Sequence, residues 1–292
     1  MDDLSFRDWL ATFTDADRCL AAFHSQKRFF RVNTLKMGVA EFQEKTKLRC
    51  SKSPFCDAAF RLEERDGFQV GKTWEYFLGL IHPQALPSIF VSLVLAPKPG
   101  ETVLDVASAP GSKFSHMAML MENRGVLVGN DLKGEKISAL YSTINRLNVL
   151  NCIVTCRDGS RLDWRGRFDR VLLDAPCTAL GSGMEAGRRW EPANSMKISG
   201  LQKRMLFSAY DALRPGGVLV YSTCTYAKEE NEDVVKNLLE NVPDAKLEDV
   251  GLDIPHERGL ADSGEEMKKC MRIYPHHLES EGFFIAKIRK GG

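Results

Sequence analysis

The pattern of hydrophobic and polar positions changes character near residue 97. Beyond it, short apolar runs alternate with longer segments whose apolar residues recur every three or four positions. Such runs predict buried strands, and such spacing predicts amphipathic helices. The predicted strands span 102–107, 126–130, 153–156, 170–173 and 218–221, and the predicted helices span 113–121, 137–148, 201–213 and 230–241. Strands that alternate with helices are typical of an α/β fold with a mostly parallel sheet.

The N-terminal region has a different pattern. It reads as helix, strand, helix, strand, with strands at 28–35 and 59–63 and a helix at 39–48. We therefore expect two domains: a small α+β subdomain over residues 1–80 and an α/β domain over residues 81–292.

The end of the chain predicts a change of strand direction. The strand-like segments 246–250 and 282–288 have no full crossover helix between them, so we expect an antiparallel edge on the sheet. The segment 214–217, Arg-Pro-Gly-Gly, predicts a turn between a helix and a strand. The longest apolar stretch, 85–97, has helical spacing and is too short to cross a bilayer, so we expect a core-facing helix and no membrane contact.

Composition is that of an ordinary globular protein, with 43% hydrophobic and 27% charged residues. The eight cysteines are scattered and include no C-x-x-C pair, which predicts free thiols. No group of cysteines and histidines has the spacing of zinc ligands, so we expect no metal. The acidic N-terminus has no apolar signal core, so we expect a cytoplasmic protein. We also expect a monomer.

A net charge of +1 hides a strong asymmetry. Residues 18–52 contain nine Lys or Arg and two Asp or Glu, whereas residues 229–266 contain three and thirteen. A basic block of this kind suits a polyanion such as RNA, although a solvated charged face has the same composition. The acidic stretch is interpreted as a solvated surface.

A loop of cofactor-binding type follows the first predicted strand of the α/β region. Gly111 allows close backbone approach, and the helix that follows points free N–H groups at a ligand. Asp131 ends the next strand, twenty residues after Gly111, where a carboxylate can accept hydrogen bonds from ribose hydroxyls. Asp158 ends a third strand and either meets an adenine amino group or serves as a turn residue.

The loop sequence narrows the choice of nucleotide. It lacks G-x-G-x-x-G, which disfavours NAD, and it lacks the P-loop motif of triphosphate-binding proteins. An adenosine with a ribose and no phosphate remains, which points to S-adenosylmethionine.

Two cysteines follow predicted strands that end at the same edge of the sheet. Cys177 lies in Asp174-Ala-Pro-Cys177, and Cys224 lies in Ser222-Thr-Cys-Thr225. Ligands bind at this edge in open α/β sheets, so two thiols beside a cofactor loop suggest covalent chemistry. A single cysteine at a strand end is more often a small buried residue, which remains our interpretation of the other six.

These motifs together resemble the NOL/NOP/Sun family of RNA cytosine-5 methyltransferases. The resemblance covers nearly the whole chain from residue 28 and rests on the following segments: Asp105-Val-Ala-Ser-Ala-Pro-Gly-Ser-Lys113, Asp174-Ala-Pro-Cys177, Tyr221-Ser-Thr-Cys-Thr225, Glu230-Asn-Glu232, Arg31-Val-Asn-Thr34, Pro99-Gly-Glu101, Leu201-Gln202 and Gly282-Phe-Phe284. Two departures are Ser112, where many members have glycine, and Ala107, where many have cysteine.

The resemblance implies a fold, a cofactor and a reaction. The fold is a Rossmann-like class I methyltransferase sheet, preceded by a small RNA-recognition-like subdomain. The cofactor is S-adenosylmethionine. The reaction is methyl transfer to carbon 5 of cytosine through a covalent cysteine–cytosine adduct, which the chemistry independently favours because carbon 5 is a poor nucleophile until a thiolate adds to carbon 6.

Residue roles follow from matching positions. Cys224 is implied as the nucleophile, and Cys177 as the thiol that assists product release, although from chemistry alone Cys177 is a fair rival. Asp174 is placed to hydrogen-bond the cytosine edge, and Lys113 to support the same site. The cofactor-binding residues are expected to be Ala107, Ser108, Ala109, Pro110, Gly111, Ser112, Lys113, Asp131, Lys136, Asp158 and Asp174.

The substrate is expected to be RNA, with tRNA favoured and rRNA the main alternative. A cytosine must leave its stack to reach a thiol. Candidate phosphate contacts are the basic block and the cluster Arg188, Arg189, Lys203 and Arg204. Phe29, Phe30 and Arg31 either contact bases or pack a small sheet, and we favour packing; Trp190 either stacks on a base or has a core or lid role.

Three competing interpretations come from other classes of function or substrate. They are a non-catalytic RNA-binding assembly factor of the same fold, a NAD-dependent oxidoreductase and a DNA methyltransferase. The presence of both cysteines disfavours the first, the missing pyrophosphate loop the second, and the Thr-Cys motif the third.

Overall fold

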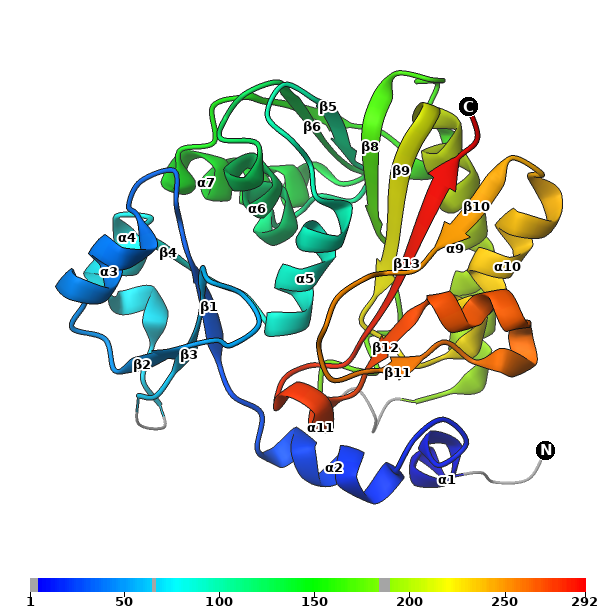
Figure 1. The fold of residues 1–292 in the computed structure, drawn as a ribbon, viewed down its shortest axis with the longest axis horizontal. Helices are drawn as coiled ribbons and strands as arrows, with labels where there is room; N and C mark the ends of the chain where they lie inside the picture. Colours follow the sequence, from blue (N-terminus) through cyan, green and yellow to red (C-terminus); the bar gives the residue numbers. More distant parts are fainter. Residues whose placement is uncertain (1–4, 65–66, 184–189) are drawn as a thin grey trace.

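The computed structural model describes residues 5–64, 67–183 and 190–292, which fold around two β-sheets (Figure 1). Within these ranges, a four-stranded sheet lies near the N-terminus and a nine-stranded sheet carries most of the remaining chain. No helix in the described ranges is both long and apolar enough to span a membrane.

The small sheet is antiparallel, and its strands lie in the order β2-β3-β1-β4. Its elements are β1 (Phe29–Val32), α3 (Val39–Lys45), β2 (Cys50–Lys52), β3 (Ala59–Leu62), the 3-10 helix η1 (Val70–Lys72), α4 (Trp74–Phe77) and β4 (Ile81–Pro83). Stacked and edge-on rings of Phe30, Phe42 and Phe60 fill its core. The predicted strands and helix of this region are confirmed. β2 and β4 were missed because three residues are too few to show a period.

The large sheet is parallel on one side and antiparallel on the other. Its strands lie in the order β11-β12-β13-β9-β8-β5-β6-β7, with β10 paired to β13. Their bounds are β5 (Thr102–Asp105), β6 (Val126–Asp131), β7 (Cys152–Cys156), β8 (Phe168–Asp174), β9 (Leu213–Thr223), β10 (Ala245–Glu248), β11 (Glu257–Arg258), β12 (Met271–Ile273) and β13 (Phe283–Lys290). β13 runs antiparallel to both β9 and β10, which confirms the predicted antiparallel edge.

Helices cover both faces of the large sheet (Figure 1). One face carries α5 (Leu86–Leu95), α6 (Ser112–Leu120) and α7 (Gly134–Leu147), and the other carries α9 (Pro192–Ala212) and α10 (Glu232–Asn241). On β9, Val218 and Val220 pack into the first core, whereas Leu219 and Tyr221 pack into the second. Burial on both faces explains why the parallel strands read as continuous apolar runs.

The N-terminal helices pack against the C-terminal half of the molecule. α1 (Phe6–Leu10) and α2 (Ala16–His24) form a separate apolar cluster with Leu180, Tyr226 and Tyr274, beside α11 (Pro275–Leu278). In Figure 1 they lie below the large sheet and away from the small one.

Two predictions about the helix before β9 are wrong in detail. α9 begins at Pro192 rather than at residue 201, because the polar first half of the helix has no apolar stripe and only Pro192, near the helix start, marks it. The segment 214–217 is not a break between α9 and β9. It belongs to β9, whose pairing with β8 shifts from Phe168–Leu213 to Arg170–Val218, so these residues bulge out.

The topology brings the ends of several strands together. β5 lies between β8 and β6, and the sheet order reverses at this point, where open α/β sheets bind ligands. Asp105, Asp131 and Asp174 end β5, β6 and β8, and Cys224 directly follows β9. The order of the strands in the sheet therefore places three carboxylates and a thiol along one edge.

Candidate active site

A cavity of about 300 Å³ opens at this edge of the sheet. Its lining includes the end of β5, the loop before α6, the end of β8, Cys224 and the start of β13. Of the predicted site residues, it brings together Ala107, Ser108, Ala109, Pro110, Ser112, Lys113, Asp174 and Cys224.

The loop before α6 is held by hydrogen bonds from its backbone N–H groups to the end of β6. The Ser108 N–H donates to the Asn130 carbonyl at 2.8 Å, and the Ala109 N–H donates to Asp131 Oδ2 at 3.3 Å. Gly111 has φ of +106°, and a Cβ there would lie 2.9 Å from Leu140 Cδ1. Glycine at 111 therefore lets the loop approach α7 closely, in addition to the approach to a ligand that the sequence suggested.

Asp131 joins the loop to β6. Its carboxylate is 4% exposed, and it also accepts the Leu132 N–H at 2.8 Å. Lys136 Nζ lies 3.8 Å from Asp131 Oδ1. The ribose contact proposed for Asp131 remains a prediction, as does the role of Lys136.

Asp158 has the contacts of a turn residue. It is the N-cap of the 3-10 helix η2 (Gly159–Arg161), and its Oδ1 accepts hydrogen bonds from the Ser160 N–H and hydroxyl. These bonds lower the pKa of Asp158. The turn alternative thus describes its present contacts, and an adenine contact remains a prediction.

Lys113 and Asp174 form an ion pair at the cavity. Lys113 Nζ lies 2.7 Å from Asp174 Oδ2, while Ser222 Oγ donates to Asp174 Oδ1 at 2.7 Å. Burial opposes the charge on Lys113, but attraction to Asp174 outweighs it and raises the pKa of the lysine. Lys113 therefore stays cationic and lies 5.0 Å from the centroid of the Phe283 ring.

The two predicted thiols are in contact. Cys177 Sγ and Cys224 Sγ lie 3.3 Å apart. The pKa of the Cys224 thiol is raised, first by its hydrogen bond to Cys177 and then by burial, while the positive charge of Lys113 lowers it.

Two carboxyl groups at the cavity were not predicted as site residues. Asp105 is 1% exposed, and burial, with the charge of Asp174, raises its pKa to about 8. Its Oδ1 has no hydrogen-bond partner among the described residues. Burial also raises the pKa of Glu281, against the attraction of Lys113. Both residues lie in or beside motifs quoted above and near one end of a strand. This position was the signal in the sequence that could have identified them as site residues.

The aromatic and basic candidates divide between core and surface. Phe30 lies in the core of the small sheet, and Arg31 is buried and donates from Nη2 to Ser115 Oγ, so packing was the better interpretation. Trp190 packs against Phe6 and Trp9.

Eight of the nine basic residues of 18–52 are exposed, the exception being Arg31. Lys203 is half-buried and Arg204 exposed on α9, while Arg188 and Arg189 lie outside the described residues.

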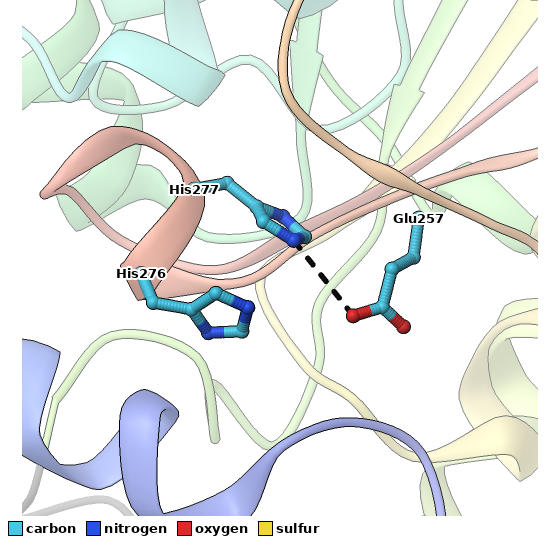
Figure 2. Close-up of side chains that lie close together, drawn as sticks. All are labelled: Glu257, His276 and His277. Atoms are coloured by element: carbon cyan, nitrogen blue, oxygen red, sulfur yellow. Dashed lines mark ion pairs between the residues drawn. The ribbon is translucent and has the colours of Figure 1, made fainter.

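One group elsewhere could offer metal ligands among the residues described. Glu257, His276 and His277 place ligand atoms within 4.8 Å of one another, and Figure 2 shows both rings beside the carboxylate. However, His277 Nδ1 accepts the Tyr274 N–H at 3.1 Å, which leaves the proton of the neutral ring on Nε2, facing Glu257. A metal-ligating histidine normally binds the ion with one ring nitrogen and donates a hydrogen bond from the N–H of the other. In His277 the nitrogen that faces Glu257 carries the proton, so this arrangement does not suit an ion.

Comparison with known proteins gives a consistent result. Residues 92–289 match the family model described as 16S rRNA methyltransferase RsmB/F. The chain is 40% identical to a tRNA (cytosine(49)-C(5))-methyltransferase of Pyrococcus abyssi, over 89% of this chain and 87% of that one. It is 38% identical to the ribosomal RNA small subunit methyltransferase F of Vibrio parahaemolyticus, of which it spans 57%.

A solved structure has the same fold over its full length. A methyltransferase homologue from Pyrococcus horikoshii aligns over 99% of both chains, with 35% identity and a TM-score of 0.81.

Proposed function

The chain belongs to the RsmB/F family of methyltransferases, and on that premise we propose that it transfers a methyl group from S-adenosylmethionine to carbon 5 of a cytosine in RNA. The resemblance that the sequence motifs indicated is thereby confirmed at the level of the family. The observation that carries the proposal is the pair of thiols, 3.3 Å apart, beside the Lys113–Asp174 ion pair at the cavity. A non-catalytic RNA-binding factor has no use for paired thiols at a cofactor cavity.

The chemistry of the cavity suits a positively charged cofactor rich in hydrogen-bond donors. Three carboxyl groups face it, those of Asp105, Asp174 and Glu281, and Asp105 Oδ1 lacks a partner among the described residues. These groups can take hydrogen bonds from the amino and hydroxyl groups of a nucleoside cofactor. Bound S-adenosylmethionine would supply an electrophilic methyl group.

The residues proposed to hold the cofactor are those of the loop and the neighbouring strand ends. They are Ala107, Ser108, Ala109, Pro110, Gly111, Ser112, Lys113, Asp131, Lys136, Asp158 and Asp174. Asp105 is added to this set because it is buried, forms part of the cavity wall and has no hydrogen-bond partner at Oδ1 within residues 5–64, 67–183 and 190–292.

Cys224 is proposed as the nucleophile. Its sulfur bonds to carbon 6 of cytosine, and the electron pair of the carbon 5–carbon 6 double bond becomes available at carbon 5. Once carbon 5 carries the methyl group, loss of its proton re-forms the double bond and expels the sulfur as a thiolate. The attacking form is the Cys224 thiolate, and the positive charge of Lys113 favours its formation against burial and the hydrogen bond to Cys177.

The neighbours of Cys224 complete the proposed site. Cys177 assists release of the methylated product. Asp174 accepts a hydrogen bond from the cytosine edge, at the exocyclic amino group or at a protonated ring nitrogen, and this favours electron flow into the ring as the sulfur adds. Lys113 holds Asp174 in place and lowers the pKa of Cys224.

The favoured RNA is tRNA. The chain spans most of the tRNA-modifying relative, whereas it spans little more than half of the rRNA-modifying relatives. The exposed lysines and arginines of residues 18–52 are proposed to contact phosphates. The division into residues 1–80 and 81–292 remains a proposal, with one correction: β4 (Ile81–Pro83) pairs with β1, so the small sheet extends three residues past the expected boundary.

The expected cellular location is the cytoplasm. All eight cysteines are free thiols, as predicted, which suits a reducing compartment. The monomeric state remains a prediction.

Methyl incorporation tests the function directly. Labelled S-adenosylmethionine is supplied with unmodified tRNA or with rRNA, and modified positions are mapped by bisulfite sequencing. Label at discrete tRNA cytosines supports the proposal in full. Label only in rRNA would keep the chemistry and reject tRNA. Label in neither RNA, with cofactor binding intact, would favour the assembly-factor interpretation.

A further inference from the structure

Each proposed catalytic cysteine is followed by a threonine, and these two threonines join the two cysteine-bearing loops. Thr178 follows Cys177 and Thr225 follows Cys224, and their hydroxyl oxygens lie 2.9 Å apart. A second link is made by the Gly181 N–H, which donates to the Cys224 carbonyl at 2.8 Å. The 3.3 Å contact between the sulfur atoms therefore lies within a set of loop–loop hydrogen bonds.

Glu230 ends the 3-10 helix η3 (Lys228–Glu230) and fixes the Cys177 loop. Its carboxylate is fully buried and accepts the Thr178 N–H at 3.0 Å and the Thr178 hydroxyl at 2.5 Å. The same carboxylate accepts Gln202 Nε2 at 3.1 Å, and this amide nitrogen also donates to the Pro176 carbonyl. Glu230 thus holds the residues on both sides of Cys177, directly and through Gln202.

The direction of these hydrogen bonds is fixed by proton count. A carboxylate only accepts, so the single hydroxyl proton of Thr178 goes to Glu230. Thr225 must then be the donor in the threonine–threonine contact. The resulting chain runs from the Thr225 hydroxyl to the Thr178 hydroxyl and ends on Glu230 Oε1, which accepts the last hydrogen bond.

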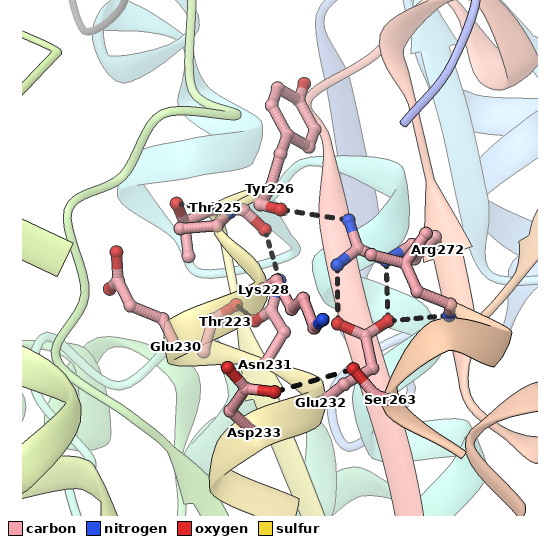
Figure 3. Close-up of polar contacts among 12 residues, drawn as sticks. Thr223, Thr225, Tyr226, Lys228, Glu230, Asn231, Glu232, Asp233, Ser263 and Arg272 are labelled. Atoms are coloured by element: carbon pink, nitrogen blue, oxygen red, sulfur yellow. Dashed lines mark hydrogen bonds and ion pairs between the residues drawn. The ribbon is translucent and has the colours of Figure 1, made fainter. Parts of the chain in front are cut away.

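Asn231 fixes the Cys224 loop in the same manner. Its Oδ1 accepts the Thr223 hydroxyl at 2.6 Å, and its Nδ2 donates to the Thr225 carbonyl at 2.9 Å, so one side chain holds both neighbours of Cys224. Figure 3 shows Asn231 between Thr223 and Thr225, with the Glu230 carboxylate turned away from the Glu232–Arg272 pair.

Glu232, the third residue of this segment, anchors it elsewhere. Its carboxylate receives Arg272 Nε at 2.7 Å and Nη2 at 2.5 Å, and both side chains are buried. Arg272 belongs to β12, so this ion pair attaches the segment to the antiparallel side of the sheet. Glu232 has no described contact with either threonine, which makes it a matched control.

We infer that Glu230 and Asn231 are positioning residues that jointly hold the two catalytic thiols in contact. The inference deepens the proposed function, because the spacing of the thiols has catalytic meaning only if both act on the cytosine. Neither residue touches the cavity in which the reaction is proposed. Their effect reaches it through Thr178, Thr223 and Thr225.

Thiol oxidation measures this spacing without RNA or cofactor. Diamide accepts two hydrogen atoms from a pair of thiols and leaves a disulfide, at a rate that depends on how often the two sulfur atoms meet. The rate of Cys177–Cys224 disulfide formation is measured by mass spectrometry of peptides from the full-length protein. Glu230→Gln replaces one acceptor oxygen with a donor that faces other donors, and we expect the rate to fall about tenfold or more. Asn231→Asp puts an acceptor oxygen opposite the Thr225 carbonyl in place of the amide donor, and it should also lower the rate of disulfide formation.

Less disruptive substitutions provide the same test if those variants fold poorly. Thr178→Val removes the hydroxyl and keeps the shape, and it should slow disulfide formation, whereas Thr178→Ser should restore it. The control Glu232→Gln should lower thermal stability without the same loss of rate. A second readout is the pH dependence of Cys224 alkylation, which should shift to lower pH in Glu230→Gln because the hydrogen bond to Cys177 is weakened.

Wild-type rates in folded Glu230→Gln and Thr178→Val would overturn the inference, as would an equal loss of rate in Glu232→Gln. Failure of the proposed function looks different. It would be absence of methyl transfer by the wild-type protein, with the oxidation rates of the variants still ordered as predicted.

Discussion

The cofactor loop on one side of the cavity and the two thiols on the other side are held by different kinds of contact. On the cofactor side, the Asp131 carboxylate accepts backbone N–H groups of Leu132 and Ala109. On the thiol side, side chains from segments 47 to 52 residues apart hold one another, as Thr178 does with Thr225 and Glu230. The Lys113–Asp174 ion pair connects the two sides.

This difference teaches that binding and chemistry can be disturbed separately. A loop held through its own backbone N–H groups depends little on its own side chains, and here it depends on one neighbouring acceptor, the Asp131 carboxylate. A side-chain network that spans distant segments loses its geometry when one member is replaced. Changes on the thiol side should therefore affect methyl transfer with little effect on cofactor affinity, and changes on the cofactor side should do the reverse.

The largest expected effect is that of Cys224→Ala. Without the sulfur, carbon 5 is not activated, so methyl transfer should be abolished while S-adenosylhomocysteine affinity stays within about twofold, since no binding contact is lost. Labelled methyl transfer and calorimetry measure the two quantities. Cys152→Ala, at the opposite end of the parallel strands, is the control and should keep full activity. Turnover near wild type in Cys224→Ala would reject the nucleophile.

Cys177→Ala should separate the attack step, which is assigned to Cys224, from the release step, which is assigned to Cys177. Attack by Cys224 proceeds but release is slowed, so a protein–RNA adduct that survives denaturation should accumulate. Denaturing gel electrophoresis with labelled RNA detects it, and the doubly substituted protein, lacking both thiols, should give none. Normal release with no adduct would show that the role assigned to Cys177 is wrong.

Asp131→Ala should sharpen the comparison from the cofactor side. Loss of a charged hydrogen-bond partner should weaken S-adenosylhomocysteine binding by about 1–3 kcal/mol, measured by calorimetry. Disulfide formation between Cys177 and Cys224 should stay at the wild-type rate, because neither sulfur depends on this loop. Asp163→Ala, an exposed carboxylate paired only with Arg157, serves as the control. Unchanged affinity in Asp131→Ala would remove this residue from the site.

The last expected effect is on stability rather than on activity or binding, and it concerns Asp105 and pH. Its pKa is about 8 in the folded protein and near 3.8 when unfolded, so between these values the folded state binds a proton that the unfolded state has released. The free energy of unfolding should therefore fall as pH rises, by at most about 1.4 kcal/mol per pH unit from this group.

Denaturant unfolding of the cofactor-free protein at pH 5 to 8 measures that slope. Asp105→Asn keeps the shape and removes the titration, so its profile should be flatter than that of the wild type. Identical slopes would mean that Asp105 is not the buried acid at the cavity.

Much of the fold could be predicted because its signals are local. The parallel strands are buried on both faces and read as apolar runs, and α7 has a clear amphipathic stripe. Strands of two or three residues, such as β11 and β12, gave no period and were missed. The early start of α9 was missed because its first turns have no apolar stripe.

The site shows the same limit. The cofactor loop and the two thiols could be located because each follows a strand that ends at the same edge. The partnerships of Glu230 and Asn231 could not, although the motif Glu230-Asn-Glu232 was noticed, since nothing local says that two adjacent residues hold two different loops. The lack of a hydrogen-bond partner for Asp105 Oδ1 in the described part of the chain is likewise a property of packing.

Trapping the covalent complex would test the central claim most directly. A tRNA carrying 5-fluorocytosine cannot lose a proton from carbon 5, so the adduct persists after methyl transfer, and peptide mass spectrometry identifies the attached residue. We predict a methylated fluorocytosine bonded to the peptide that contains Cys224. Attachment to Cys177, or methylation of ordinary tRNA with no trapped adduct, would contradict the claim.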